Sequence, residues 1–188
     1  MTSQERFIDL YTKSIRRQGS DSLLKMLLDS DFFTAPASTR FHNDHEGGLC
    51  EHSLHVWEEL MRLLSVYPEI RVTGETAAII SLLHDVCKIG CYKQEMRNVK
   101  VNNVWVQKPF YTFQEDFPYG GHGSKSVFLV SQHMVLTAQE AVAINCHMGP
   151  WDRTPSDYGL GAAYEQYPIA WLLHVADESA SYIREAKK

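Results

Sequence analysis

The apolar segment that ends at His84 and Asp85 constrains the fold of this chain more than any other segment. Residues 76–83 read Thr-Ala-Ala-Ile-Ile-Ser-Leu-Leu, and such an almost uninterrupted apolar run predicts a helix that is buried on all sides. His84 and Asp85 follow at positions where a protein core would normally hold Leu or Ala. Buried polar groups cost free energy unless they are hydrogen-bonded, paired or bound to a metal. We therefore expect this pair to belong to a buried functional site.

Lys88 adds a cation to the same segment. It follows His84 by four residues, and this spacing predicts that the two side chains share a helix face, with Gly90 ending the helix. An imidazole, a carboxylate and a nearby ammonium are the groups that a metal-assisted site for phosphate esters needs. The hypothesis from this segment is therefore metal-dependent chemistry on a phosphate ester.

Size, charge and cysteine content limit the other possibilities. A chain of 188 residues with 44% hydrophobic and 22% charged residues is typical of one soluble domain. A net charge of -5 gives no global attraction to nucleic acid or to an anionic membrane, so extended nucleic acid is not an expected partner. The polar N-terminus, the absence of an apolar run of about 20 residues and four cysteines without a CxxC pair predict a cytoplasmic protein.

The remaining hydrophobic pattern predicts an all-α bundle that forms a single domain over residues 1–188. N-terminal helices within 1–40 are expected to pack on a core formed by 41–183. The predicted helices cover about 4–17, a segment from 21, 49–67, a segment from 122, a segment after a capping box at 137–140 that ends near 147, and a segment from 168. We interpret 151–161 as a loop and 184–188 as a polar tail.

Residues 96–113 break the helical pattern. Short β-prone runs flank Asn102 and Asn103, and Asn tolerates the positive φ angles that a two-residue hairpin turn requires. We therefore predict a small β-hairpin inserted into the helical domain.

Six residues share one property: each is an imidazole or carboxylate within an apolar helix segment, or at a helix end beside glycine. They are His52, His84, Asp85, His122, His147 and Asp177. Any one of them alone is more typical of a structural residue. Together they fall on five predicted helices, which is how a helical bundle builds a metal site in its core. Mixed imidazole and carboxylate ligands suit manganese, iron, cobalt, nickel or zinc rather than calcium.

The order of these residues resembles that of the HD-domain metallohydrolase superfamily. Residues 47–54 are similar to the first histidine motif of the family and residues 82–89 to its His-Asp motif. Residues 121–123 and 144–149 resemble the two later histidine motifs, and 173–177 the final aspartate motif. The resemblance covers about 41–183. It is closest to HD domains attached to some bacterial 3′→5′ exoribonucleases and to small stand-alone phage and bacterial HD proteins.

The resemblance implies a specific ligand set. A first metal would be held by His52, His84, Asp85 and Asp177, and a second by His122 and His147, with Asp85 bridging. Met148 stands where dinuclear members often carry a second consecutive histidine, so one or two ions per chain remain open. With a single ion, His122 and His147 would instead bind phosphate oxygens or transfer protons.

The resemblance also implies hydrolysis by a metal-activated hydroxide. Asp85 and Lys88 are the expected catalytic residues, and Lys88, Lys125 and Arg153 are the candidate ligands of the substrate phosphate. His42 and His45 are interpreted as surface histidines near the entrance. A structural role is expected for three further histidines: His55, His133 and His174.

The leading functional hypothesis is a metal-dependent phosphohydrolase that cleaves a phosphate ester, with a small nucleotide as the favoured substrate. One alternative is a phosphodiesterase acting on short or cyclic oligonucleotides. Another is a non-catalytic HD-fold module that binds nucleotides or regulates a partner. Oxygen chemistry at a di-iron site, known for some relatives of this fold, needs the same six ligands. The oligomeric state and the individual substrate are not indicated by the sequence.

Overall fold

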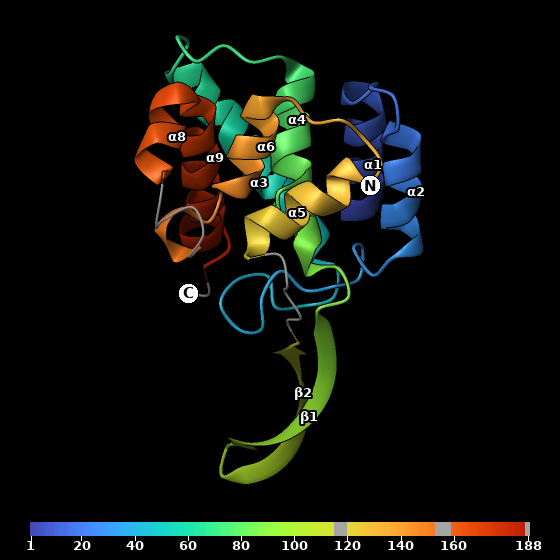
Figure 1. Cartoon of the computed structure of the whole chain (residues 1–188). Helices are drawn as coiled ribbons and strands as arrows, with labels where there is room; N and C mark the ends of the chain where they lie inside the picture. Colours follow the sequence, from blue (N-terminus) through green and yellow to red (C-terminus); the bar gives the residue numbers. More distant parts are fainter. Residues whose placement is uncertain (115–119, 153–158, 187–188) are drawn as a thin grey trace.

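Helices dominate the computed structural model, which describes residues 1–114, 120–152 and 159–186 (Figure 1). The longer helices are α1 (Ser3–Ser14), α2 (Ser20–Asp29), α3 (Gly48–Val66), α4 (Gly74–Leu83), α5 (His122–Ser131), α6 (Ala138–Asn145), α8 (Leu160–Gln166) and α9 (Pro168–Ser179). Two 3-10 turns, η1 (Val86–Lys88) and η2 (Gly149–Trp151), and a π-helix, η3 (Ala180–Arg184), complete the helical elements of the described ranges. The predicted mostly helical fold is confirmed.

The central helix is α4. Every residue from Thr76 to Leu83 is buried, and α4 contacts α1, α3 and α6. The helix begins at Thr73, whose hydroxyl accepts the backbone N–H of Thr76 at 3.0 Å, as an N-cap residue does. Its last helical residue is Leu83, so His84 follows directly at the end of the most buried helix of the described chain.

The predicted shared helix face of His84 and Lys88 is wrong. The α-helical backbone ends at Leu83, Asp85 has φ -109° and ψ 16°, and η1 follows over Val86–Lys88. The tighter 3-10 turn brings Lys88 back toward Asp85, and their charged groups lie 2.7 Å apart. The α-helix therefore ends directly before His84 and Asp85.

Helices α3 and α9, which carry two further ligand-type residues, contact each other. A close approach of the preceding loop determines how α3 begins: a Cβ at Gly48 would lie only 2.0 Å from the backbone oxygen of Asn43. Only glycine allows the loop to pack so closely on the helix start. His52 projects from the second turn of α3, and Asp177 from the last part of α9.

The first helix is shorter than the predicted 4–17, because the chain leaves the helical conformation at Ile15. The backbone N–H groups of Arg16 and Arg17 instead donate to Glu75 Oε1 at 2.8 and 3.1 Å. The Arg17 guanidinium reaches the fully buried carboxylate of Glu140 on α6, at 2.6 and 2.9 Å. This ion pair connects the N-terminal helices with the core of the bundle.

Replacing Glu140 by Gln is expected to lower the free energy of unfolding by about 3 kcal/mol, because it leaves Arg17 without its buried partner. For a domain of this size the melting temperature should fall on the order of 10 °C. Burial alone would raise the pKa of Glu140, but hydrogen bonds from Arg17 and Thr137 outweigh it and hold the pKa below 4.5. A depressed pKa stabilises the fold above that value, so the difference between wild type and variant should shrink as the pH falls below it.

Thermal melts across a pH series measure this effect. Asp9→Asn is the matched control, because it breaks an exposed ion pair with Lys13 and should change stability by less than about 1 kcal/mol. An equally small effect of Glu140→Gln would contradict the role given to the buried pair.

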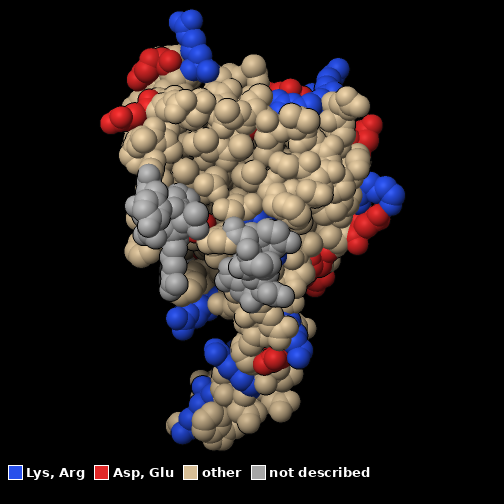
Figure 2. All heavy atoms as spheres, in the orientation of Figure 1, with Lys and Arg blue, Asp and Glu red and all other residues tan. Residues whose placement is uncertain are grey.

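The predicted hairpin is confirmed and is longer than 96–113. Strand β1 (Tyr92–Val101) pairs antiparallel with β2 (Val104–Phe113), and the turn residues Asn102 and Asn103 have φ angles of +49° and +64°. The hairpin projects from the helical body (Figure 1), and Figure 2 shows lysine and arginine side chains along it. At its base the N–H of Gln114 donates to the carbonyl of Cys91 at 2.7 Å.

Helix α8 was not predicted, because a short segment with Ala and Gly carries little periodic signal. It begins at Leu160, at the end of the segment 151–161 that we interpreted as a loop, of which 153–158 lie outside the described residues. The segment 184–188 is not a simple polar tail, since the side chain of Glu185 is buried. Within the described ranges no helix combines the length and apolar character needed to cross a bilayer.

Candidate metal centre

Five of the six predicted ligand residues converge beside the end of α4. His52, His84 and His147 are completely buried, and Asp85 and Asp177 are nearly so. His52 Nε2 lies 3.1 Å from Asp177 Oδ1 and 3.3 Å from His84 Nε2. Asp85 Oδ2 lies 3.5 Å from His84 Nε2, and its Oδ1 lies 3.4 Å from His147 Nε2. The structure therefore brings together side chains from α3, the α4–η1 junction, the end of α6 and α9.

The outer nitrogen of each imidazole has an acceptor. Nδ1 of His84 lies 2.8 Å from the carbonyl of Ser81, and Nδ1 of His147 lies 2.7 Å from the carbonyl of Ile144. A carbonyl can only accept, so both Nδ1 atoms carry the proton. In neutral rings the Nε2 lone pairs then point inward, toward the carboxylates. Orienting imidazole ligands by such outer hydrogen bonds is a general property of metal sites.

The distances between the possible ligand atoms, and one nitrogen without a hydrogen bond, indicate whether these residues fit a metal ion. Ligand atoms about 2.1 Å from an ion are separated by about 3.0–3.4 Å in tetrahedral or octahedral arrangements, and the contacts above span 3.1–3.5 Å. His147 Nε2 is buried without a hydrogen-bond partner among the described residues. Two sets of possible ligands, His52 with His84 and Asp85, and His84 with His147 and Asp177, each have their atoms within 4.8 Å. These buried His and Asp groups could therefore hold a metal ion.

The pKa values of several groups in the same cluster are strongly shifted. Burial alone would lower the pKa of His52, but hydrogen bonds to Asp177 and Glu185 outweigh it and raise the pKa to about 10. Burial alone would raise the pKa of Asp85, but the charges of Lys88 and His84 hold it well below its usual value. The pKa of Asp177 is likewise lowered, against the effect of burial, by the hydrogen bond with His52. Both carboxylates are therefore ionised.

Glu185 is a residue of the site that the sequence reasoning missed. Its carboxylate oxygens lie 3.1 and 3.2 Å from His52 Nδ1 and 2.7 Å from His55 Nδ1, so it accepts a hydrogen bond from both rings. Burial alone would raise the pKa of Glu185, but these hydrogen bonds lower it to about 2. The available signal was an acidic residue about two helical turns after Asp177.

His42 is not a surface histidine, contrary to the prediction. Its ring lies 4.9 Å from the ring of His52, at an interplanar angle of 32°, and burial, together with the charge of His52, lowers its pKa to about 4. The loop before α3 folds over the cluster and thereby brings this histidine inward. Of the three histidines expected to be structural, His133 contacts Ser22 and His174 contacts the His147 carbonyl.

Lys88 forms its bonds within the cluster and with the adjacent loop. Its ammonium donates to Asp85 Oδ2 at 2.7 Å and to the carbonyl of Ala37 at 2.8 Å. Burial alone would lower the pKa of Lys88, but the charge of Asp85 outweighs it and keeps the pKa above its usual value. Lys88 therefore remains a cation that orients Asp85.

Two other predicted residues, His122 and Lys125, are not among the five converging residues. His122, at the start of α5, is half-buried and stacks on Phe113, with centroids 6.1 Å apart. It belongs to none of the possible ligand groups found among the described residues, and burial lowers its pKa. Lys125 Nζ lies 3.4 Å from Cys91 Sγ. Arg153 lies outside the described residues.

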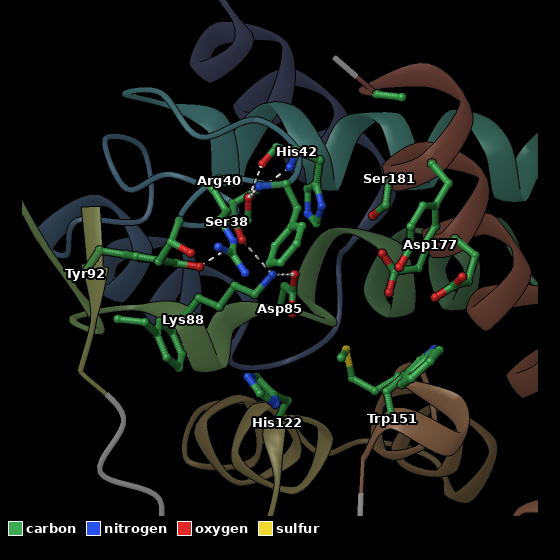
Figure 3. A pocket seen from close by; sticks show the side chains of 18 residues that line it. Ser38, Arg40, His42, Asp85, Lys88, Tyr92, His122, Trp151, Asp177 and Ser181 are labelled. Carbon is green, nitrogen blue, oxygen red and sulfur yellow. Dashed lines mark hydrogen bonds and ion pairs between the residues drawn. The ribbon is translucent and has the colours of Figure 1, made fainter. Parts of the chain in front are cut away.

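A cavity of about 730 Å³ opens onto the cluster (Figure 3). Asp85, Asp177 and Lys88 line it, together with the imidazoles of His42 and His122. The described residues of its lining include the aromatic side chains of Phe41, Tyr92, Phe113, Trp151 and Tyr182. Cavities of roughly 300–1,000 Å³ with a few convergent polar groups are typical of small-ligand sites.

Comparison with known proteins gives no assignment: no protein-family model, curated protein or solved structure matches this chain.

Proposed function

We propose that this protein is a metal-dependent phosphohydrolase that cleaves a phosphate ester of a nucleotide. The observation that supports this most strongly is the buried cluster of imidazoles and two carboxylates, of which Asp85 and Asp177 also line a ligand-sized cavity. Membership of the HD-domain superfamily is part of the proposal. It is supported by the ordered motifs in the sequence and by the convergence of His52, His84, Asp85 and Asp177.

In this proposal His52, His84, Asp85, His147 and Asp177 would hold one divalent ion. Such an ion supplies Lewis acidity, which lowers the pKa of water and offsets negative charge on a phosphoryl group. Lys88 holds Asp85 in place and balances its charge. Glu185 fixes the ring of His52. A second ion bound with His122 remains a prediction from the resemblance.

His122 and His42 are placed to contact the substrate. Both rings line the cavity, and burial lowers both pKa values below the usual value for histidine, so each neutral ring offers the substrate a hydrogen-bond donor or acceptor. A nucleotide is favoured over a simpler phosphate ester because five aromatic side chains line the same cavity, and aromatic rings stack on bases.

The test combines metal analysis with an activity screen. Protein purified without a histidine tag or chelator is expected to contain close to one divalent metal per chain. We expect it to release phosphate from at least one member of a panel of nucleoside mono-, di- and triphosphates when manganese, cobalt or nickel is added. Chelation with EDTA should abolish the release, and re-addition of the metal should restore it.

The other outcomes discriminate between the alternatives. Two metals per chain with phosphate release would place His122 in a second site. Cleavage of short or cyclic oligonucleotides without phosphate release from mononucleotides would indicate a phosphodiesterase instead. Bound iron without any hydrolysis would indicate oxygen chemistry. A protein that binds neither metal nor nucleotide would contradict the proposal.

A further inference from the structure

A substrate phosphate is best bound by a cationic side chain in the cavity, and neither of the two predicted lysines is placed to supply it. Lys88 already bonds Asp85 and the Ala37 carbonyl. Lys125 is not among the residues that line the cavity and contacts Cys91 instead. Arg153, the third predicted residue, lies outside the described residues. Among the described residues, a different basic side chain has to be sought at the cavity.

We propose that Arg40, in the loop between α2 and α3, binds a phosphate group of the substrate and makes the cavity selective for nucleoside phosphates. Arg40 and Lys88 are the two Lys or Arg residues among the described residues of the cavity lining. Arg40 is exposed, and its guanidinium lies 4.8 Å from the centroid of the Phe41 ring. No ion pair between Arg40 and a described carboxylate occurs, so a ligand need not displace an existing partner.

The loop that carries Arg40 is held in a defined conformation. The Ser38 hydroxyl accepts the backbone N–H groups of Phe41 and His42, each at 2.9 Å, and donates to the carbonyl of His42 at 2.6 Å. Ala37 continues this network, because its carbonyl accepts bonds from Lys88 and from the Tyr92 hydroxyl, at 2.8 and 2.9 Å. A closed turn therefore presents Arg40 at the cavity, and Lys88 connects that turn to Asp85.

The positions of the other lining residues define the class of ligand. Figure 3 places Arg40 and Ser38 on the opposite side of the pocket from His122 and Trp151, with Asp85 between them. A guanidinium forms two parallel hydrogen bonds to a phosphate, and an aromatic wall stacks on a flat base. A nucleoside phosphate offers both groups, whereas inorganic phosphate or a sugar phosphate offers only one. This inference deepens the proposed function and rests on it.

The experiment measures binding separately from turnover. The probe is adenosine 5′-(α,β-methylene)diphosphate, titrated calorimetrically into metal-loaded protein, alongside steady-state kinetics on the nucleotide that is hydrolysed best. Losing a charged bidentate contact should raise the Kd of Arg40→Ala on the order of 10- to 100-fold. KM should rise with a largely unchanged kcat, because the contact is kept throughout the reaction. Arg40→Lys should fall between wild type and Arg40→Ala.

Arg97→Ala is the matched control. Arg97 also lies over an aromatic ring, that of Phe110 at 5.1 Å, but it is on the hairpin and does not line the cavity. Its Kd should equal that of wild type. The metal content and melting temperature of all three variants should also match wild type, because both arginines are exposed.

Three results would overturn the assignment of Arg40: no binding of the probe by wild type, an unchanged Kd in Arg40→Ala, or an equal loss in Arg97→Ala. With wild-type phosphate release, each would leave the proposed hydrolase intact. Conversely, binding of the probe that depends on Arg40, in a protein that releases no phosphate from any nucleotide, would support the Arg40 site and remove the hydrolase proposal. The two proposals can therefore fail separately.

Discussion

Asp85→Asn protein is expected to lose bound metal and phosphate release together. Asp85 is the one side chain within 4 Å of all three inward imidazole nitrogens in the described cluster, at 3.4, 3.5 and 3.7 Å. The amide keeps the size of the side chain but removes the negative charge that a cation requires. Metal content per chain, measured by elemental analysis, should fall from about one to near zero, and turnover should fall with it.

The same substitution leaves Lys88 as a buried cation without its counter-ion, which should cost about 3–5 kcal/mol of unfolding free energy. Circular dichroism must therefore establish that the variant is folded. Asp177→Asn provides a second route if it is not, because Asp177 pairs with His52 and not with Lys88. As a control, Asp29→Asn removes an aspartate from an exposed pair with Lys25 and should change neither metal nor activity. Folded Asp85→Asn protein with wild-type metal content would refute the assignment of this site.

Glu185→Gln is expected to weaken metal binding on the order of 10- to 100-fold while leaving the fold intact, the range typical of residues that orient a metal ligand. The carboxylate accepts hydrogen bonds from both His52 and His55. Gln has one uncharged amide oxygen in its place, which cannot form both hydrogen bonds equally well. The Kd for cobalt, measured by calorimetry, should therefore rise. The visible absorption spectrum of the bound cobalt should also change, because it reports the ligand geometry.

Arg184→Ala is the control that distinguishes two possible roles of Glu185: orienting the ring of His52, and holding the C-terminal segment against the bundle. Arg184 precedes Glu185 and forms an ion pair with Glu58 on α3, so its loss loosens the same segment without touching an imidazole. We expect Arg184→Ala to bind cobalt as wild type does. Equal weakening in both variants would mean that Glu185 acts only by holding the segment in place.

Patterns that depend on neighbouring residues were predictable from the sequence. The apolar run of α4, the Asn102–Asn103 turn and the Thr137 capping box all appear as expected, with both capping hydrogen bonds formed. Each of these features is determined by local geometry: periodicity, tolerance of positive φ, or side-chain bonding within one turn. The convergence of five of the six ligand-type residues followed from counting polar residues in apolar segments.

Contacts between distant segments were not predictable in the same way. Glu185 and His52 are 133 residues apart, and the role of Arg40 depends on a loop conformation created by Ser38. The ending of α4 before Lys88 also depends on partners outside the helix, since Lys88 bonds the distant Ala37 carbonyl. Such features require the positions of several elements at once, and periodicity contains no information about them.

The hydrogen bond between Gln114 and Cys91 makes the hairpin a self-closing insertion. The two ends of the hairpin are held next to each other by this bond. The distance between these ends therefore stays the same whatever sequence connects them. Length and composition beyond Tyr92 and Phe113 can therefore diverge without a compensating change in the bundle. In protein engineering, this position is suited to grafting a recognition peptide or a reporter domain onto the body while leaving its internal packing untouched.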